Sequence, residues 1–309
     1  MLKTIRAVAF LLLLGTLLTG TALPRPAHDD PVYDFKTFTV PGALDTIAAG
    51  IDSFGNITGT FDDANGVHAF LRDRRGDFIT FDPPSSTLTI GFDVNSAGVA
   101  VGSFLDDSGS NEQIGFLRDR AGSFTILRVP GVDGDTIPIG INLFGQISGF
   151  TEVEDTGERN GFLRNPNGSF ITFSVPGTTR TEASKINDLG VIAGEYKDAS
   201  GFHGFVRTAL GAIIKFDLPG PVAPQESGQL GINNLGEIVG QYKDDLGAHG
   251  FLRRIDGKVT TLDIPGSANT SANDINDFGV IVGNFVDQNG AAAAFIATPT
   301  ACQFLHCER

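Results

Sequence analysis

Residues 173–177 read Phe-Ser-Val-Pro-Gly, and this stretch returns at regular intervals along the chain. Each copy is a short, mostly apolar segment that ends at proline, which is typical of a β-strand running into a turn. The proline at the fourth position of each copy follows the previous one after 43 or 46 residues. The copies lie at 38–42, 81–85 (a degenerate Phe-Asp-Pro-Pro-Ser), 127–131, 173–177, 216–220 and 262–266.

Two more markers keep the same period, so the chain contains six tandem units. One is an Asn or Asp followed three residues later by Gly: Asp52, Asn95, Asn142, Asn187, Asn233 and Asn276. The other is the last residue of a His-Gly-Phe-like triplet: Phe70, Phe116, Phe162, Phe205, Phe251 and Phe295.

Each unit alternates apolar and polar residues in short runs bounded by turn residues, as strands require. The fourth unit has four such runs, at 171–175, 182–187, 191–196 and 203–207. We therefore predict an all-β fold over residues 34–298, a six-bladed β-propeller of four-stranded blades. The small residues of the second run suit the innermost strand, and the strand before Gly42 should pair into the last blade and close the ring. A solenoid or an open sandwich is the alternative, although either would leave strand edges unpaired.

The repeat resembles a known family. Residues 140–149 read Gly-Ile-Asn-Leu-Phe-Gly-Gln-Ile-Ser-Gly, and residues 66–70 contain the tripeptide His-Ala-Phe. These motifs are similar to those of the bacterial extracellular HAF family, and the resemblance covers residues 38–297. It implies export and a repeat architecture, and it implies no catalytic residues.

The N-terminus has the pattern of a secretory signal peptide. Lys3 and Arg6 precede an apolar run at 7–18, which is too short to span a bilayer, and small residues end at Ala22. We predict a signal peptide at 1–22, a proline-containing spacer at 23–33 and a secreted or periplasmic protein without a transmembrane segment, which we expect to be a monomer. A buried N-terminal helix is the alternative interpretation of this segment.

Composition excludes one class of partner. The 309 residues carry 22 Lys and Arg against 36 Asp and Glu, a net charge of −14, which disfavours nucleic acid because phosphate binding needs a basic surface. The 40 glycines follow the turns of the repeat. We expect an extracellular protein or glycan as the partner.

The only two cysteines, Cys302 and Cys307, lie in the C-terminal tail, 299–309. In an oxidising compartment we predict a disulfide between them. A Cys/His metal site that includes His306 is the alternative.

Three histidines, His68, His203 and His249, occupy one position of the repeat. Because their strand lies away from the predicted axis, we expect a structural role in hydrogen bonding at a hairpin, with ligand or metal binding as the alternative. An arginine recurs two residues after the marker Phe, and we expect it to clamp neighbouring blades: Arg72, Arg118, Arg164, Arg207 and Arg253.

Acidic turns such as 63–66 and 198–201 lack the ligand spacing and the final Glu of a calcium loop, so weak calcium binding is only an alternative to a plain turn. The third unit adds Glu152, Glu154, Asp155 and Glu158, where paired carboxylates could serve glycoside cleavage. A charged surface hairpin is the simpler interpretation.

The candidate ligand site lies at the predicted axial funnel. Two residues before the Asn or Asp marker, the units carry Gly50, Asp93, Gly140, Lys185, Gly231 and Asp274, so Asp93, Lys185 and Asp274 break the symmetry. We assign no catalytic residue, metal or cofactor. The sequence favours a non-enzymatic binding or scaffold module, and a secreted polysaccharide hydrolase or lyase is the alternative.

Overall fold

The computed structural model describes residues 31–109, 112–220 and 228–300. These ranges contain 24 β-strands and no helix. The predicted signal peptide, most of the spacer, and Cys302 and Cys307 lie outside the described residues.

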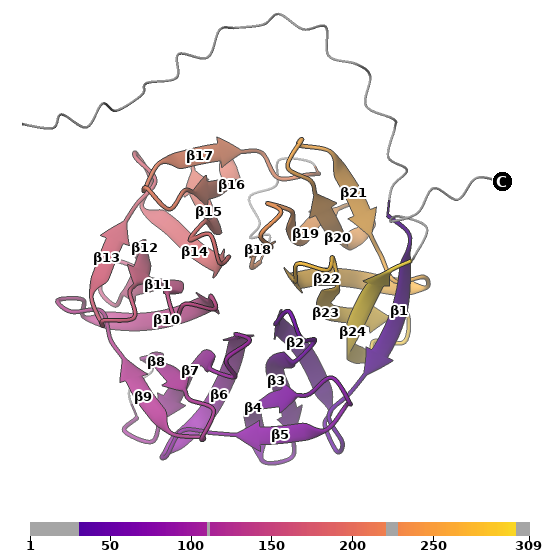
Figure 1. Ribbon diagram of the computed structural model, residues 1–309, viewed down its shortest axis with the longest axis horizontal. Coiled ribbons are helices and arrows are strands. Elements are labelled where there is room, and N and C mark those ends of the chain that lie inside the picture. The colour runs from indigo at the N-terminus through magenta and orange to yellow at the C-terminus, as the bar shows by residue number, and fades with distance from the viewer. Residues whose placement is uncertain (1–30, 110–111, 221–227, 301–309) are drawn as a thin grey trace, which may run out of the picture. The chain divides into compact units, whose positions relative to one another are not determined.

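The strands form antiparallel sheets arranged around a centre, as in a β-propeller (Figure 1). Counted from the centre, each sheet begins with the second run of a repeat, as its small residues predicted, and ends with the first run of the following repeat. Below, a unit is counted as one such set of four strands. The all-β, propeller-like prediction is therefore confirmed. The first two units are the sheet β2 (Asp45–Ile51), β3 (Ile57–Asp63), β4 (Gly66–Arg72), β5 (Phe78–Phe81) and the sheet β6 (Ser86–Val94), β7 (Ala100–Asp106), β8 (Ile114–Arg118), β9 (Phe124–Leu127).

The prediction of six separate four-stranded sheets needs a correction, because there are four such sheets and one of eight strands. In the larger sheet, two four-stranded halves are joined by a single parallel pair, Arg159 with Arg180. The contact arises where the acidic hairpin of the third unit brings its returning strand beside the next unit. The halves are β10 (Gly134–Ile141), β11 (Ile147–Val153), β12 (Arg159–Arg164), β13 (Phe170–Phe173) and β14 (Arg180–Ile186), β15 (Ile192–Asp198), β16 (Gly201–Arg207), β17 (Ile213–Phe216).

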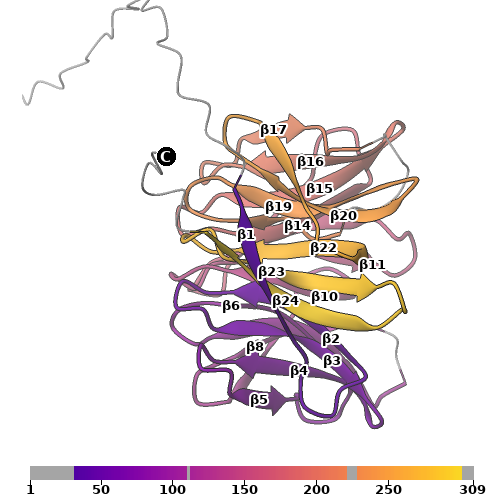
Figure 2. The same cartoon turned by 90° about the vertical axis from the view of Figure 1, so that its right-hand side faces the viewer.

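The start of the described chain completes the last sheet. Strand β1 (Tyr33–Phe38) pairs antiparallel with β24, from Tyr33 opposite Pro299 to Phe38 opposite Ala294 (Figure 2). The outer strand of that sheet thus comes from the other end of the sequence. The last two sheets are β18 (Gly231–Ile232), β19 (Ile238–Asp244), β20 (Gly247–Arg253), β21 (Val259–Leu262) and β22 (Ser267–Ile275), β23 (Ile281–Asp287), β24 (Ala292–Pro299), β1.

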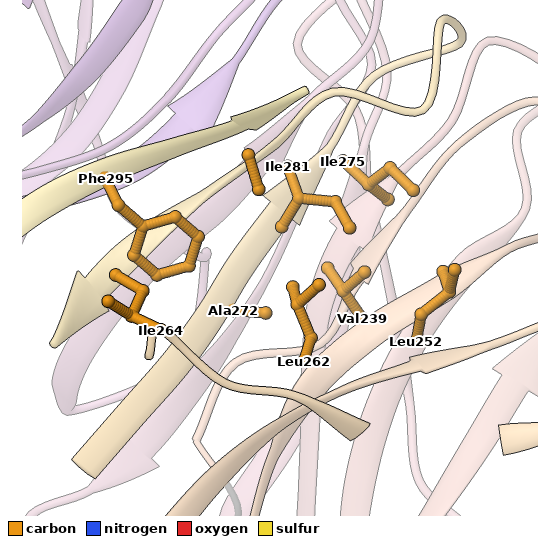
Figure 3. Packing of buried hydrophobic residues seen from close by; sticks show 9 residues of the cluster. Val239, Leu252, Leu262, Ile264, Ala272, Ile275, Ile281 and Phe295 are labelled. Carbon is orange, nitrogen blue, oxygen red and sulfur yellow. The ribbon is translucent and has the colours of Figure 1, made fainter. Parts of the chain in front are cut away.

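The core lies between neighbouring sheets rather than in one centre. Figure 3 shows one such layer, in which Leu262 from β21 packs near Ile281 and Phe295 from the last sheet. Within a sheet, the marker Phe lies opposite a glycine of the second strand, as Phe205 does opposite Gly194. A Cβ atom on Gly194 would lie 2.6 Å from Cζ of Phe205, so only glycine leaves room for the ring.

The recurring arginine joins consecutive units by cation–π contacts. The guanidinium carbon of Arg207 lies 4.7 Å from the ring centre of Phe173, on the outer strand of the preceding unit. Where the preceding unit has Leu127 in place of Phe, Arg164 contacts only Phe170 of its own unit, at 6.0 Å. The same inter-unit contact pairs Arg72 with Phe38, Arg118 with Phe81 and Arg253 with Phe216.

We predict that Arg207→Ala lowers the free energy of unfolding by about 1 kcal/mol more than Arg164→Ala does, because a desolvated cation–π contact contributes ~1–2 kcal/mol. Urea unfolding of both variants measures the difference. A double-mutant cycle with Phe173→Leu should assign the difference to the ring. Equal losses at the two arginines would contradict the clamp.

Candidate functional site

The centre of the ring is lined by the symmetry-breaking position of the inner strands. Glycine alternates there with Asp93, Lys185 and Asp274, which lie on β6, β14 and β22. Each glycine faces the next strand so closely that no side chain fits. A Cβ atom on Gly50 would lie 2.7 Å from Cα of Asp93, and one on Gly231 would lie 2.7 Å from Cα of Asp274. The glycines of alternate units therefore make room for the charged residues of the others.

Asp93, Lys185 and Asp274 meet in one buried ion cluster, which we call the axial triad. The Lys185 ammonium lies 3.3 Å from Oδ1 of Asp93 and 3.7 Å from Oδ2 of Asp274. It also donates a hydrogen bond of 2.6 Å to the carbonyl oxygen of Phe92. The Lys185 side chain is 2% exposed. The sequence singled out these three residues, and the structure brings them together.

The two carboxylates also bind the neighbouring inner strands. Oδ2 of Asp93 accepts a hydrogen bond of 2.8 Å from the backbone N–H of Ile141, and Oδ2 of Asp274 accepts one of 2.9 Å from Ile51. Each aspartate thus ties its own unit to the next one. The register of β6 and of β22 shifts immediately before the aspartate, which is the sign of a β-bulge that re-aims the side chain.

The axial triad holds two carboxyl groups and one amine, all three buried away from solvent. Burial raises the pKa of Asp93 to about 7, Lys185 opposes the shift, and the Asp274 charge adds to it. Burial likewise raises the pKa of Asp274, again opposed by Lys185. The triad is neutral when one carboxyl is protonated and carries one excess negative charge when both are ionised.

We predict that the triad makes the protein less stable as pH rises. The native state binds a proton at Asp93 that the unfolded state has lost, since the raised pKa of about 7 lies above the ordinary 3.8. This contribution is complete below pH 3.8 and is lost as pH rises through 7, with a slope of at most ~1.4 kcal/mol per pH unit. Asp93→Asn should flatten urea-unfolding stability between pH 5.5 and 8.5. The matched Asp155→Asn, on an exposed turn, should leave the wild-type slope, and an unchanged slope in Asp93→Asn would refute the assignment.

Above the triad, the Asn or Asp markers form a ring of hydrogen bonds. The side-chain amide of Asn95 donates to the backbone carbonyl of Asn142 at 2.9 Å, and each following unit repeats the contact. The ring is open at one point, because Asp52 has no side-chain amide with which to donate the same hydrogen bond to the second unit. The other bonds run from Asn142 to Asn187, Asn187 to Asn233, Asn233 to Asn276 and Asn276 to Asp52.

Sequence reasoning assigned these asparagines to turns alone. They do cap turns, since Oδ1 of Asn95 accepts hydrogen bonds from the N–H groups of Ala97 and Val99. An aspartate would cap a turn equally well. The preference for Asn in five of six units was the signal for a second, donating contact, and this signal was overlooked.

The Asn ring surrounds a pocket at one end of the axis, with the triad as its floor. At the rim, Asn234 lies between Asp188 and Asp277: its N–H donates to Oδ1 of Asp277 at 2.8 Å, and its carbonyl-type Oδ1 accepts from the N–H of Asp188 at 2.8 Å. The pocket volume is about 70 Å³. That volume holds two or three waters at roughly 30 Å³ each, far below the ~300–1,000 Å³ of a site that encloses an organic ligand.

The three histidines lie away from the axis, each between two carboxylates of a hairpin. In the fifth unit, Nδ1 of His249 lies 2.7 Å from Asp263 and Nε2 lies 3.1 Å from Asp244. In the first unit, Nδ1 of His68 lies 2.8 Å from Asp82, whereas Nε2 lies 3.6 Å from Asp63, which is beyond hydrogen-bond distance. In His249, where both ring nitrogens lie within hydrogen-bond distance of carboxylates, the contacts favour the doubly protonated ring. These contacts are the hairpin bonding that the sequence led us to expect.

The histidine of the fourth unit also contacts a serine. Oγ of Ser200 lies 2.9 Å from Nε2 of His203, and Nδ1 of His203 lies 3.2 Å from Asp217. The spacing resembles a nucleophilic triad, but Ser200 donates its only proton to Asp198 at 2.6 Å. Nε2 of His203 also lies 3.2 Å from Oδ1 of Asp198, so one carboxylate holds both the serine and the imidazole.

We predict a His249 pKa above the ordinary 6.5, because the hydrogen bond to Asp263 favours the imidazolium. Its contribution to stability is complete below pH 6.5 and is lost as pH rises through the raised value. An NMR titration of His249 should show the shift, and Asp263→Asn should reduce it. The matched Asp155→Asn should not, and a shift that survives Asp263→Asn would contradict the cause given.

The carboxylates of the third unit form ion pairs or lie on an exposed turn. Glu152 forms an ion pair of 2.7 Å with Arg159, which also binds Glu182 at 3.0 Å. Glu154 and Asp155 are exposed on the turn. The acidic turns use their oxygens locally, as Asp198 does in accepting from the N–H of Ser200 at 2.8 Å. Across the described residues, no group of three or more His, Cys, Asp or Glu side chains is arranged to hold a metal ion.

No family model matches the sequence, and no curated protein matches it. Solved structures match the fold. A protein of unknown function from Dyadobacter fermentans has 11% identity and a TM-score of 0.56, over 88% of this chain and 99% of that one. A putative TolB from Agrobacterium tumefaciens has 12% identity and a TM-score of 0.55, over 83% and 91%.

An inactive virginiamycin B lyase from Staphylococcus aureus with quinupristin has 13% identity and a TM-score of 0.53, over 87% of this chain and 100% of that one. At these identities the likeness shows the β-propeller fold alone. The described residues contain no helix that is long and apolar enough to cross a membrane.

Proposed function

We propose that the chain is an exported, non-enzymatic binding module, a HAF-type repeat protein that folds as a six-bladed propeller. The eight-stranded sheet counts as two blades, and β1 closes the ring by joining the last one. A protein of this kind acts in the periplasm or outside the cell. Its ligand, an extracellular protein or glycan, lies over the end of the ring where the axial pocket opens.

The burial and the hydrogen bonds of the axial triad are the main support for this proposal. A general acid or base must come within hydrogen-bond reach of a substrate. Lys185 is 2% exposed and already donates to Phe92. Asp93 accepts from two backbone N–H groups, those of Ile141 and Val94. The triad therefore supports the ring and shapes the floor of the pocket, which suits a binding surface better than a catalytic centre.

The pocket dimensions favour a ligand that covers the opening. A volume of about 70 Å³ cannot enclose a sugar or a peptide, so only a narrow group can enter. The likeness in fold to a lyase and to a putative gluconolactonase leaves a polysaccharide hydrolase or lyase as the competing function.

The test uses the full secreted chain on a combined glycan and protein array, together with an assay for product release from the same polysaccharides. We expect saturable binding to one class of ligand without product. A variant pair, Asp188→Asn and Asp155→Asn, separates the pocket rim from an exposed turn elsewhere. Turnover of a polysaccharide that Asp93→Asn abolishes would replace this proposal with the enzymatic one.

A further inference from the structure

The end of the ring that holds the pocket is unusually apolar. The hairpin turns after the inner strands all lie at this end, because the Asn ring links each turn to the next. Five of these six turns place a large apolar side chain in the same position, two residues after the marker, and each is 60–65% exposed. They are Phe54, Phe144, Leu189, Leu235 and Phe278.

The outer turns at the same end extend the surface. Ile255, which is 75% exposed, lies beside the inner turn of its own unit, with its Cδ1 atom 3.1 Å from the position of a Cβ on Gly236. The outer turn of the fourth unit exposes Leu210 in the same way. Its neighbour in the chain, Ala209, lies beside Gly190 of the inner turn. Every unit except the second therefore contributes an apolar group around the pocket, and we call these groups the apolar arc: Phe54, Phe144, Leu189, Leu210, Leu235, Ile255 and Phe278.

The rim inside the apolar arc is acidic. Asp188 and Asp277 are partly exposed, and each accepts hydrogen bonds only from backbone or amide N–H groups, as Asp188 does from Leu143 at 2.8 Å. Within the described ranges, neither carboxylate lies within ion-pair distance of a Lys or Arg side chain. A carboxylate has about four acceptor sites, so both retain capacity for a cation.

We propose that this face docks a protein partner through a segment in which a Lys or Arg side chain, flanked by apolar residues, enters the axial pocket. The proposal rests on the proposed function and names the ligand class. The cationic end of a long side chain is small enough to enter a pocket of about 70 Å³, which Asp188 and Asp277 line at the rim. Its apolar neighbours cover the apolar arc, since large exposed apolar groups around a polar pocket are typical of a protein contact.

Charge complementarity selects this occupant over others. An anionic membrane surface would be repelled by the acidic rim and by the net charge of −14. A second copy of the chain would bring a second acidic rim against the first. A glycan would lack both the cation and the apolar flanks.

The experiment screens the full secreted chain against a library of nine-residue peptides. The central residue is Lys, Arg, Gln or Glu, and its neighbours are Leu and Phe or, in the matched set, Ser and Gly. We expect binding only with a basic centre and apolar neighbours, weakening as salt is raised. Asp188→Asn with Asp277→Asn, and separately Leu189→Ser with Leu235→Ser, should each weaken binding at least tenfold.

The control variant is Leu246→Ser, an equally simple change at an exposed leucine in the hairpin at the opposite end of β19, and it should bind as the wild type does. Circular dichroism and thermal unfolding check that every variant is folded. Selection of Gln or Glu centres, absence of any peptide binder, vesicle binding lost in Leu189→Ser with Leu235→Ser, or a dimer lost in that variant would each overturn the proposal. A ligand on the array that binds all variants equally would leave the binding function standing and remove only this docking mode.

Discussion

Packing of the inner strands around the axis is the constraint on which the rest of the structure depends. Strands from every unit converge there, and the space between them admits a side chain from only every second one. The space is left free by three glycines, Gly50, Gly140 and Gly231. It is filled by the side chains of Asp93, Lys185 and Asp274. The inner strands are then joined by ion pairs and hydrogen bonds. Because hydrogen bonds are directional, they define the geometry of the axis more closely than an apolar contact would.

Beyond the axial triad, the same repeat is held by contacts between one unit and the next. The Asn ring ties the inner turns together, and the Arg–Phe contacts tie the third strand of a unit to the outer strand of the preceding one. A departure at one position changes the contact of its partner, since Arg164 has no ring of the preceding unit to contact where Leu127 replaces Phe. Each interface therefore depends on residues about 40 positions apart, which explains why the markers stay in step.

Much of the fold could be read from the repeat, because turn residues and alternation act locally. The strand order and the convergence of Asp93, Lys185 and Asp274 followed from counting units. The joining of two units at Arg159 and Arg180 did not, since it depends on how an irregular hairpin bends in space. The Asn ring, the apolar arc and the second carboxylate beside each histidine were also missed, because each needs the spatial neighbour of a residue.

The sequence by itself determined the period, the strands and the residues that break the symmetry, because glycine, proline and alternating apolar residues restrict the backbone where they stand. The tertiary structure alone decided what those residues do. It buried Lys185 between two carboxylates, used the histidines as hairpin clamps and gathered scattered turn residues into one acidic, apolar-rimmed face. Burial and charge pairing arise only when distant segments meet, and so no local pattern could specify them.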